Sequence, residues 1–342
     1  MLPPDWFAVV LAGGRGTRFW PLSRRNLPKQ CLSVDGGPTL LQRTVARTGL
    51  PPERVLVVTG PDMVEPVRAQ LPGVPVLVEP APRNTAPAIA WATSEVARRG
   101  GAGCFVLPSD HAIADEASFR AALGLAATAA EDGALVTLGV RPSRPETGYG
   151  WIEPGEGAPP ALPVRRFVEK PPLAVAETLL AGGRHLWNAG MFVWTTRALR
   201  DAVDRYLPGT AEMLRRLDAG AEVADVWSLS EATSIDYGVM ERSDRIRVVP
   251  VDFGWSDVGS WPALQEILPP GEGGAVVAEA IVARNARGNV VHAHGKLVAL
   301  LDVEDLVVVD TPDAVLVTRK GSSQDVRLLL EEIERRGLGR YS

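Results

Sequence analysis

Short β-branched segments alternate with helical segments along residues 1–140, and this alternation limits the possible folds more than any other feature. The expected strands are short runs rich in Val and Leu that end in Gly, Pro or Asp, at 7–13, 54–60, 74–80, 104–110 and 134–140. The expected helices lie between them, at 39–48, 62–70, 86–99 and 117–131. Strands and helices that alternate at this spacing form a mostly parallel sheet covered on both faces. The sequence therefore predicts an α/β, Rossmann-like fold, whose ligands bind beyond the carboxyl ends of the strands.

The regular alternation weakens after residue 145. From about 145 to 265, Gly and aromatic residues collect in motifs that we interpret as strands and long loops built over the sheet edge. Residues 269–274, PPGEGG, are an expected linker, so the predicted domains are 1–268 and 275–342. The second domain consists of short strands and turns and ends in an amphipathic helix that stops at Gly337. Its strands show no hexapeptide period, so their pattern alone does not predict a β-helix.

Composition excludes several classes of partner. A net charge of −5 and a pI near 5.6 argue against nucleic acid, which normally requires a basic face. The two cysteines, Cys31 and Cys104, form neither a disulfide framework nor a zinc site, so a cytoplasmic location is expected. No apolar run has the length of a membrane span and no targeting segment is recognisable, so no membrane partner is expected.

Residues 9–30, VVLAGGRGTRFWPLSRRNLPKQ, combine glycines and basic residues directly after the first expected strand. Their spacing matches neither a P-loop nor a dinucleotide fingerprint, because Phe19 stands where a final glycine should be. The glycines would let backbone N–H groups approach an anion, and the basic side chains would add charge. The residues concerned are Gly13, Gly14 and Gly16 for the backbone, and Arg15, Arg18 and Lys29 for the charge. The alternative is a tight turn with solvent-facing arginines, but three basic groups after a buried strand favour phosphate.

Two aspartates are candidate Mg²⁺ ligands. Asp110, in LPSDH, directly follows an expected strand, and Asp257, in GWSDVGSW, lies in a turn that Trp255 and Trp261 would hold rigid. One or two carboxylates typically hold a Mg²⁺ ion that is bound to phosphates. The alternatives are a turn or helix-capping role for Asp110 and a tryptophan-pinned structural corner at Asp257.

The motifs FVEKP and WNAG supply candidate groups for a sugar phosphate. Glu169 and Lys170 offer an acceptor and a cation before Pro171, and Asn188 adds an amide that can both donate and accept. Either motif alone would indicate only an exposed Glu–Lys pair or a turn asparagine. Lys170 and Lys29 are two of only four lysines among 36 basic residues, which suggests that a compact point charge matters there.

These groups suffice for one kind of chemistry. The sequence has no Gly-x-Ser-x-Gly elbow, no Cys/His pair and no clustered histidines. A phosphate monoester, whose second pKa is about 6, is already a dianion at neutral pH and needs no general base to attack another phosphate. Mg²⁺, cations and glycine amides are therefore sufficient for nucleotidyl transfer by positioning and charge neutralisation.

With its motifs in this order, the chain resembles the sugar-1-phosphate nucleotidyltransferases, and most closely the mannose-1-phosphate guanylyltransferases, or GDP-mannose pyrophosphorylases. The motifs that carry the resemblance span nearly the whole chain: LAGGRGTRFWPLSR…PKQ, EPAPRNTAPA, FVEKP, WNAGMFVW, SIDYGVMER and GWSDVGSW. It implies that GTP and α-mannose 1-phosphate give GDP-mannose and pyrophosphate with Mg²⁺, and that a small left-handed β-helix follows the catalytic domain. Some family members carry a fused cupin-type isomerase domain, which is not expected here.

The resemblance also implies roles for individual residues. The catalytic set is Arg18, Lys29, Asp110 and Asp257, with the two aspartates as Mg²⁺ ligands. The nucleotide set is Leu11, Ala12, Gly13, Gly14, Arg15, Gly16, Thr17, Glu79, Asn84 and Thr85. The sugar-phosphate set is Gly148, Glu169, Lys170 and Asn188. Within the nucleotide set, Glu79 is the candidate acceptor for guanine N–H groups, and the alternative is that it only pairs with Arg83.

Two rival functions are compatible with these motifs. One is the same chemistry with another specificity, such as thymidylyl or uridylyl transfer to glucose 1-phosphate. The other is a catalytically silent homologue that binds nucleotide sugars and regulates a partner, but such a protein should have lost basic loop residues or a carboxylate, and all are present. A homodimer is compatible with the sequence, which does not determine the oligomeric state.

Overall fold

The computed structural model describes residues 2–14, 16–25, 27–268 and 270–342. The chain forms two compact units, and it passes between them several times. The first unit consists of Met1–Gly13, Thr44–Pro108 and Asp115–Trp255, and the second of Gly14–Arg43, Ser109–Ala114 and Ser256–Ser342. Residues that are far apart in sequence therefore gather within one unit, and each unit is described by itself.

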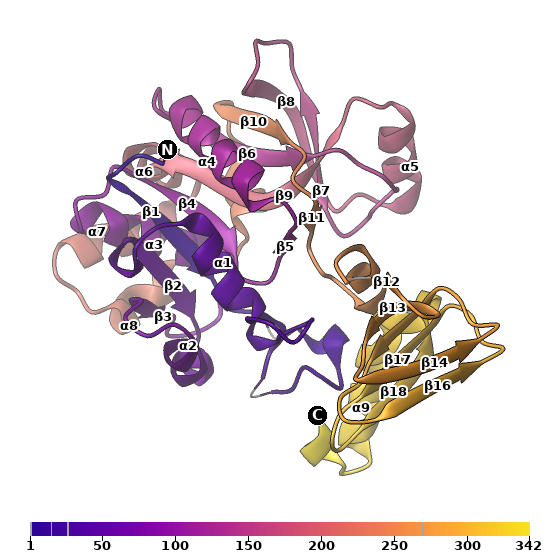
Figure 1. The fold of residues 1–342 in the computed structure, drawn as a ribbon. Coiled ribbons are helices and arrows are strands. Elements are labelled where there is room, and N and C mark those ends of the chain that lie inside the picture. The colour runs from indigo at the N-terminus through magenta and orange to yellow at the C-terminus, as the bar shows by residue number, and fades with distance from the viewer. Residues whose placement is uncertain (1, 15, 26, 269) are drawn as a thin grey trace. The chain divides into compact units, whose positions relative to one another are not determined.

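The first unit is built on a nine-stranded sheet in the order β3-β2-β1-β4-β9-β6-β10-β8-β7 (Figure 1). Its strands are β1 (Trp6–Leu11), β2 (Val55–Thr59), β3 (Val76–Val78), β4 (Gly103–Pro108), β6 (Leu135–Val140), β7 (Gly150–Pro154), β8 (Leu162–Glu169), β9 (Leu186–Thr195) and β10 (Ile246–Val251). Strands β3, β2, β1 and β4 run parallel, as do β6 and β10. The predicted α/β fold is confirmed, and antiparallel strands from the 145–265 region extend and interrupt the parallel arrangement.

The helices of this region follow from capping residues and apolar faces. They are α1 (Leu40–Thr48), α2 (Val64–Gln70), α3 (Thr85–Arg98), α4 (Glu116–Ala130), α5 (Leu173–Ala181), α6 (Thr196–Tyr206), α7 (Pro208–Asp218) and α8 (Val223–Val226). Asp115 caps α4 by accepting the N–H groups of Ala117 and Ser118, each at 3.0 Å. Helix α3 packs on β1, β2 and β4, and α4 packs on β6, β9 and β10, so buried alanines of both helices complete the core of the sheet.

The carboxyl ends of the parallel strands share one edge of the sheet. Leu11, the last residue of β1, aligns with Val58 of β2 and with Pro108 of β4. The next residue, Ala12, donates its N–H to Val58 O at 2.8 Å, and its carbonyl accepts the Thr59 hydroxyl at 2.8 Å. The start of the glycine loop is therefore anchored at the sheet edge where ligands of such folds bind.

The second unit contains stacked strands in its C-terminal part. A five-stranded sheet has the order β12-β13-β15-β17-β18, and β14 pairs with β16. The bounds are β12 (Pro270–Gly271), β13 (Gly274–Val277), β14 (Ala280–Arg284), β15 (Asn289–His292), β16 (Leu297–Leu301), β17 (Leu306–Asp310) and β18 (Val315–Arg319). Pairs β13–β15, β15–β17 and β14–β16 are parallel, as expected for successive coils of a β-helix. The predicted closing helix is α9 (Val326–Arg335), and Gly337 follows it at φ 70°.

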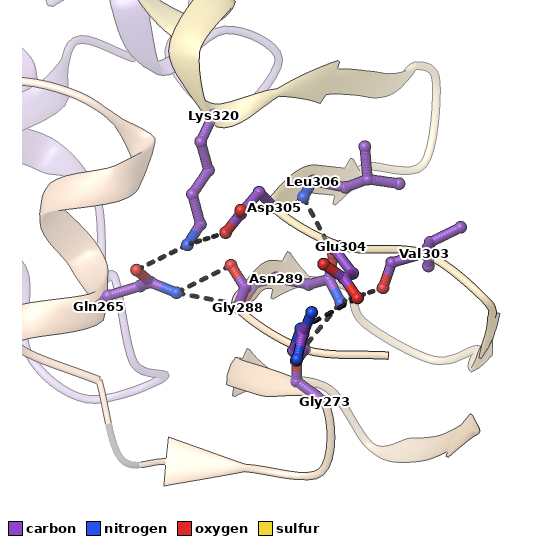
Figure 2. Close-up of polar contacts among 10 residues, drawn as sticks. Gln265, Gly273, Gly288, Asn289, Val303, Glu304, Asp305, Leu306 and Lys320 are labelled. Carbon is purple, nitrogen blue, oxygen red and sulfur yellow. Dashed lines mark hydrogen bonds and ion pairs between the residues drawn. The ribbon is translucent and has the colours of Figure 1, made fainter. Parts of the chain in front are cut away.

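A buried asparagine ties successive coils together. Asn289 is fully buried, and its Nδ2 donates to the carbonyls of Gly273 at 3.2 Å and Val303 at 3.3 Å. Its Oδ1 accepts the N–H of Leu306 at 2.9 Å, so three turns of backbone meet on one side chain (Figure 2). The amide thus satisfies backbone groups that would otherwise be buried without partners.

Lysines 296 and 320 have structural partners in this part of the second unit. Lys320 Nζ donates to Gln265 Oε1 at 2.9 Å and to Asp305 Oδ1 at 3.2 Å (Figure 2). Lys296 Nζ donates to Asp310 Oδ1 at 2.8 Å.

The short strands β5 (Ala112–Ile113) and β11 (Trp255–Ser256) lie close to points where the chain changes unit. Within the described ranges, no helix has both the length and the apolarity to cross a membrane.

Candidate active site

The amine of Lys29 joins three predicted site residues in the second unit. Lys29 starts a short helical turn, Lys29–Cys31, and its side chain is only 7 % exposed. Its Nζ donates to Asp110 Oδ2 at 2.8 Å and to the backbone carbonyl of Asp257 at 2.6 Å. Residues separated by 81 and 228 positions in sequence therefore meet at one ammonium group.

Close packing around the lysine explains two other residues of the loop. Gly16 has φ 59°, and a Cβ at this position would lie 2.2 Å from Lys29 Cβ, so only glycine fits. Phe19, which replaces the final glycine of a dinucleotide fingerprint, is buried with its ring centroid 5.0 Å from that of Trp261. Lys29 Nζ lies 5.8 Å from the Phe19 ring centroid. Phe19 is therefore a core residue that supports the lysine.

The carboxyl group of Asp110 is held in its ionised form. Burial alone would raise its pKa, but the charges of Lys29 and His111 and the hydrogen bond from Lys29 together hold the pKa of Asp110 below its usual value. His111 Nε2 lies 4.0 Å from Asp110 Oδ1. Asp110 thus presents an anionic oxygen pair beside a cation at the carboxyl end of β4.

The turn that carries Asp257 is tightly constrained. Val258 is buried and has φ 48°, a conformation that costs a β-branched residue free energy and persists only where the surroundings impose it. Gly259 N–H donates to Asp257 Oδ1 at 3.0 Å. Trp261 is fully buried and donates its indole N–H to Trp20 O at 3.3 Å. The hydrogen bond within the turn and the buried Trp261 therefore constrain the backbone beside Asp257.

The donor chemistry around Lys29 fits Mg²⁺. The carboxyl groups of Asp110 and Asp257 contain hard oxygen atoms of the kind that Mg²⁺ prefers, and Asp110 is anionic. Among the described residues, no cluster of three or more His, Cys, Asp or Glu side chains could enclose a metal ion on its own. Mg²⁺ is usually bound through one or two carboxylates together with substrate phosphates and water, so the donor chemistry of Asp110 and Asp257 is compatible with it.

The glycine loop leaves its backbone accessible. Gly13 and Gly14 are exposed, and among the described residues no atom lies within 4 Å of where their Cβ atoms would be. Arg18 is exposed in the turn Thr17–Phe19. Arg15 and the side chain of Thr17 lie outside the described part of the chain, so their predicted roles stay predictions.

The sugar-phosphate candidates gather in the first unit, at the ends of β8 and β9. Glu169 Oε1 pairs with Lys170 Nζ at 3.0 Å, and the Glu169 side chain is 7 % exposed. Glu169 Oε2 is buried without a hydrogen-bond partner among the described residues, which leaves an acceptor for a ligand. Lys170 adopts φ 46°, an uncommon conformation for a lysine. The Gly148 N–H donates to Glu146 Oε1 at 3.0 Å.

Asn188 is buried, and its amide contacts a residue that sequence reasoning missed. Its Nδ2 donates to Asp236 Oδ1 at 2.9 Å. Burial, and then the negative charge of Glu169, raise the pKa of Asp236 to about 7. The motif SIDYGVMER, which contains Asp236, was part of the family resemblance, but nothing local in it shows that its aspartate meets Asn188.

The predicted base-binding residues lie at the end of β3 and the start of α3. Burial raises the pKa of Glu79 to about 7. Arg83 Nη1 donates to Ser230 O at 2.6 Å, and the described contacts of Glu79 include no ion pair with Arg83, so that alternative is not supported. Asn84 caps α3 through the Thr85 N–H, and Thr85 Oγ1 accepts the N–H of Ile235 at 2.9 Å.

A sheet of this topology, with a glycine loop after β1 and a lysine–aspartate cluster, is typical of nucleotidyltransferases. Residues 7–270 match the family model described as Nucleotidyl transferase, and residues 279–333 match the model described as MannoseP isomerase/GMP-like beta-helix domain. The chain belongs to the nucleotidyl transferase family and is an enzyme of the sugar-1-phosphate nucleotidyltransferase class. The resemblance inferred from the motifs is confirmed.

Several named proteins are similar to this chain over most of its length. A mannose-1-phosphate guanylyltransferase of Escherichia coli K12 is 38% identical over 97% of this chain and 74% of its own length. The xanthan biosynthesis protein XanB of Xanthomonas campestris is 40% identical, with the same two coverages. A crystal structure described as a mannose-1-phosphate geranyltransferase from Thermus thermophilus is 39% identical and superposes with a TM-score of 0.92, covering 96% of this chain and 99% of that one.

Proposed function

We propose that the enzyme transfers GMP from GTP to α-D-mannose 1-phosphate, forming GDP-mannose and pyrophosphate with the help of Mg²⁺. The observation that carries the proposal is the bridging position of Lys29 between Asp110 and Asp257. It supports phosphate chemistry, because a buried ammonium group held by one carboxylate and one backbone carbonyl is suited to charge that develops on phosphate oxygens. The names of the relatives support the choice of guanine and mannose.

In the proposed reaction, a phosphate oxygen of the sugar phosphate attacks the α-phosphorus of GTP and the bond to the pyrophosphate group breaks. The attacking group is already a dianion, so no side chain has to remove a proton. Lys29 and Arg18 would neutralise phosphate charge, and the exposed N–H groups of the glycine loop would bind phosphate oxygens. Asp110 and Asp257 would hold Mg²⁺, which supplies positive charge to the phosphate chain when it is bound.

The sugar phosphate would bind in the first unit. Glu169 Oε2 would accept a sugar hydroxyl, because it is buried and otherwise lacks a partner among the described residues. Lys170 would pair with the phosphate group, since its side chain is more than half exposed while its ammonium group pairs with Glu169. Asn188 would contribute an N–H group, and Gly148 would line the same site.

Guanine would bind beside Glu79. Guanine presents two N–H donors that a carboxylate can accept, whereas adenine presents an acceptor at the matching position. Burial has raised the pKa of Glu79 to about 7, so the two donors of guanine would favour its ionised form. Leaving a buried charged acceptor unpaired against adenine should cost about 1–3 kcal/mol.

The test is pyrophosphate release with GTP, ATP, UTP and dTTP, each combined with mannose 1-phosphate or glucose 1-phosphate. GTP with mannose 1-phosphate should give the highest kcat/KM, and Glu79→Gln should narrow the gap between GTP and ATP. Equal use of GTP, UTP and dTTP would refute guanylyl transfer while leaving nucleotidyl transfer intact.

A further inference from the structure

The amide of Asn188 is almost fully engaged by the protein. Its Oδ1 accepts the Gly190 N–H at 3.2 Å and the Thr137 hydroxyl at 2.8 Å. A backbone N–H can only donate, so the Gly190 contact identifies the oxygen end of the amide. The nitrogen end donates one hydrogen to Asp236 Oδ1 at 2.9 Å. One N–H is then all that the Asn188 side chain offers to a sugar.

Asp236 is placed for this contact by an unusual backbone turn. Residues Asp236–Met240 form a single π-helical turn, in which the Glu241 N–H donates to Asp236 O at 2.8 Å. Such widened turns are rare and occur frequently at functional sites. The turn brings a carboxyl group toward Asn188, although an apolar residue would suit a partly buried position better.

The titratable groups around Asp236 come from two segments. Glu169 and Lys170 stand at the end of β8, Tyr237 follows Asp236 on its own turn, and Glu241 accepts the Glu169 N–H at 2.9 Å. Burial would lower the pKa of Lys170, but the hydrogen bond and charge of Glu169 outweigh it and raise that pKa, so Lys170 stays positive at neutral pH. Asp236 therefore faces one carboxylate and one cation at close range.

We infer that Asp236 is a positioning residue of the sugar site: it holds the Asn188 amide with one N–H toward the sugar, and it binds a proton when the sugar phosphate binds. This inference rests on the proposed function. The ligand brings about two negative charges close to Glu169, so an ionised Asp236 would add repulsion. Burial and Glu169 already raise the pKa of Asp236 to about 7 in the free protein, and a bound dianion would raise it further.

The sign of the pH effect follows from linkage. If the bound form holds the proton more tightly than the free form, KM for the sugar phosphate must rise as the pH rises above about 7. The phosphate group is already a dianion there, because its second pKa is about 6, so its own ionisation does not produce this rise. For one coupled proton, the limit is about a tenfold change in KM per pH unit.

The experiment measures kcat and KM for mannose 1-phosphate between about pH 7 and 8.5 at saturating GTP. In the unmodified enzyme KM should rise about tenfold across this range while kcat changes little. Asp236→Asn keeps an oxygen that can accept the Asn188 N–H but cannot titrate, so its KM should be low and independent of pH. Asp236→Ala cannot titrate either, so its KM should also be independent of pH, and it should lie about tenfold above that of Asp236→Asn, since a lost hydrogen bond of about 1.4 kcal/mol corresponds to that factor. The control is Asp225→Asn, which removes an exposed carboxylate elsewhere in the first unit. This variant should show the same KM and the same pH dependence as the unmodified enzyme.

The inference is overturned if Asp236→Asn keeps the pH dependence of the unmodified enzyme, or if Asp236→Ala lowers kcat and leaves KM unchanged. Thermal melting of each variant establishes that it is folded. If the unmodified enzyme does not use mannose 1-phosphate, the proposed function fails by itself. The pH profile is then measured with whichever sugar 1-phosphate supports pyrophosphate release, and the same outcomes decide the role of Asp236.

Discussion

Lys29 shows why a single residue type can be required at one position. Its ammonium group is nearly buried between a carboxylate oxygen and a backbone carbonyl, and Gly16 packs against its Cβ. An ammonium is a compact charge with three donors, whereas guanidinium is a larger planar fork. The two other lysines of the second unit, Lys296 and Lys320, pair with Asp310 of β17 and with Asp305 directly before it, so lysine scarcity alone does not identify the site.

We expect Lys29→Ala to lower kcat by at least about a hundredfold, because the lost charge acts on the transferring phosphate. Lys29→Arg should rescue poorly, since the larger fork does not fit the same acceptors. Steady-state kinetics with GTP and mannose 1-phosphate test both, with Lys296→Ala as the control that leaves kcat unchanged. Full rescue by arginine would show that the position needs only positive charge.

Substitution of Asp110 or Asp257 should lower kcat, which the loss of a purely structural aspartate would not do. Asp110→Asn and Asp257→Asn each preserve size but remove a carboxylate that we propose binds Mg²⁺. Each should lose several kcal/mol of transition-state stabilisation, which lowers kcat about a hundredfold or more. The loss should persist at saturating Mg²⁺. Near-normal kcat in either variant at high Mg²⁺ would remove that residue from the proposed metal site.

His292 gives the second unit an acid-sensitive core. It is 1 % exposed, both ring nitrogens lack partners among the described residues, and its ring packs 6.0 Å from Trp261 and 4.9 Å from His294. Burial, and then the neighbouring His294, lower the pKa of His292 to about 4. The unfolded chain therefore binds a proton from about pH 6.5, but the folded chain resists it until about pH 4.

The contribution of neutral His292 to the free energy of unfolding should consequently be fully present above about pH 6.5 and should be lost as the pH falls toward 4. By pH 4.5 this residue alone should lower the free energy of unfolding by about 2–3 kcal/mol. Denaturant unfolding at pH 7.5 and 4.5 measures the decrease in the free energy of unfolding between the two pH values. In His292→Leu, this decrease should be smaller by the contribution of His292. An identical loss in the variant and the unmodified protein would exclude His292 as the cause.

At the scale of elements, the stacked strands of the second unit depend on the side chain of Asn289, whose role the local sequence pattern does not indicate. Asn289 supplies three hydrogen bonds to backbone groups of neighbouring turns from a fully buried position. Asn289→Ala should lower the free energy of unfolding of the protein by about 2–4 kcal/mol, because buried backbone groups lose their partners. Urea denaturation measures this effect. A loss below about 1 kcal/mol would mean that water or a shifted turn replaces the amide.

The elements that could be predicted are those whose signal is local. Runs such as FAVVLAG and CFVLPSD are buried over nearly their whole length, so their composition alone indicates β1 and β4. The place of β9 between β4 and β6 could not be predicted, because its antiparallel partners are distant in sequence. The stacked strands of the second unit also lacked a period, and their parallel pairing became visible only in the structure.

The candidate site was predictable only in part, for a similar reason. Glycines, Lys29 and Asp110 follow strands at one sheet edge, so fold reasoning brings them together. Asp236 was missed because its importance comes from burial and from contact with Asn188, which no spacing rule indicates. The alternative for Glu79, an ion pair with Arg83, found no support because Arg83 donates to the Ser230 carbonyl.

At the scale of the whole molecule, both units contain residues from early and late parts of the chain. The cluster around Lys29 needs the loop after β1, the segment Ser109–Ala114 that follows β4, and the turn at Asp257, and the residues that meet there all belong to the second unit. The sugar-phosphate candidates and Asp236 belong to the first. Local sequence signals indicate each segment, but they do not show which segments share a unit.

The most direct test of the central claim follows the oxygen atoms of the sugar phosphate. The enzyme is given GTP, Mg²⁺ and mannose 1-phosphate whose non-ester phosphate oxygens carry a heavy-oxygen label, and both products are analysed by mass spectrometry. If the sugar phosphate attacks the α-phosphorus of GTP, all of the label should appear in GDP-mannose and none in pyrophosphate. Label in pyrophosphate, or no GDP-mannose under conditions where the protein is folded, would contradict the account.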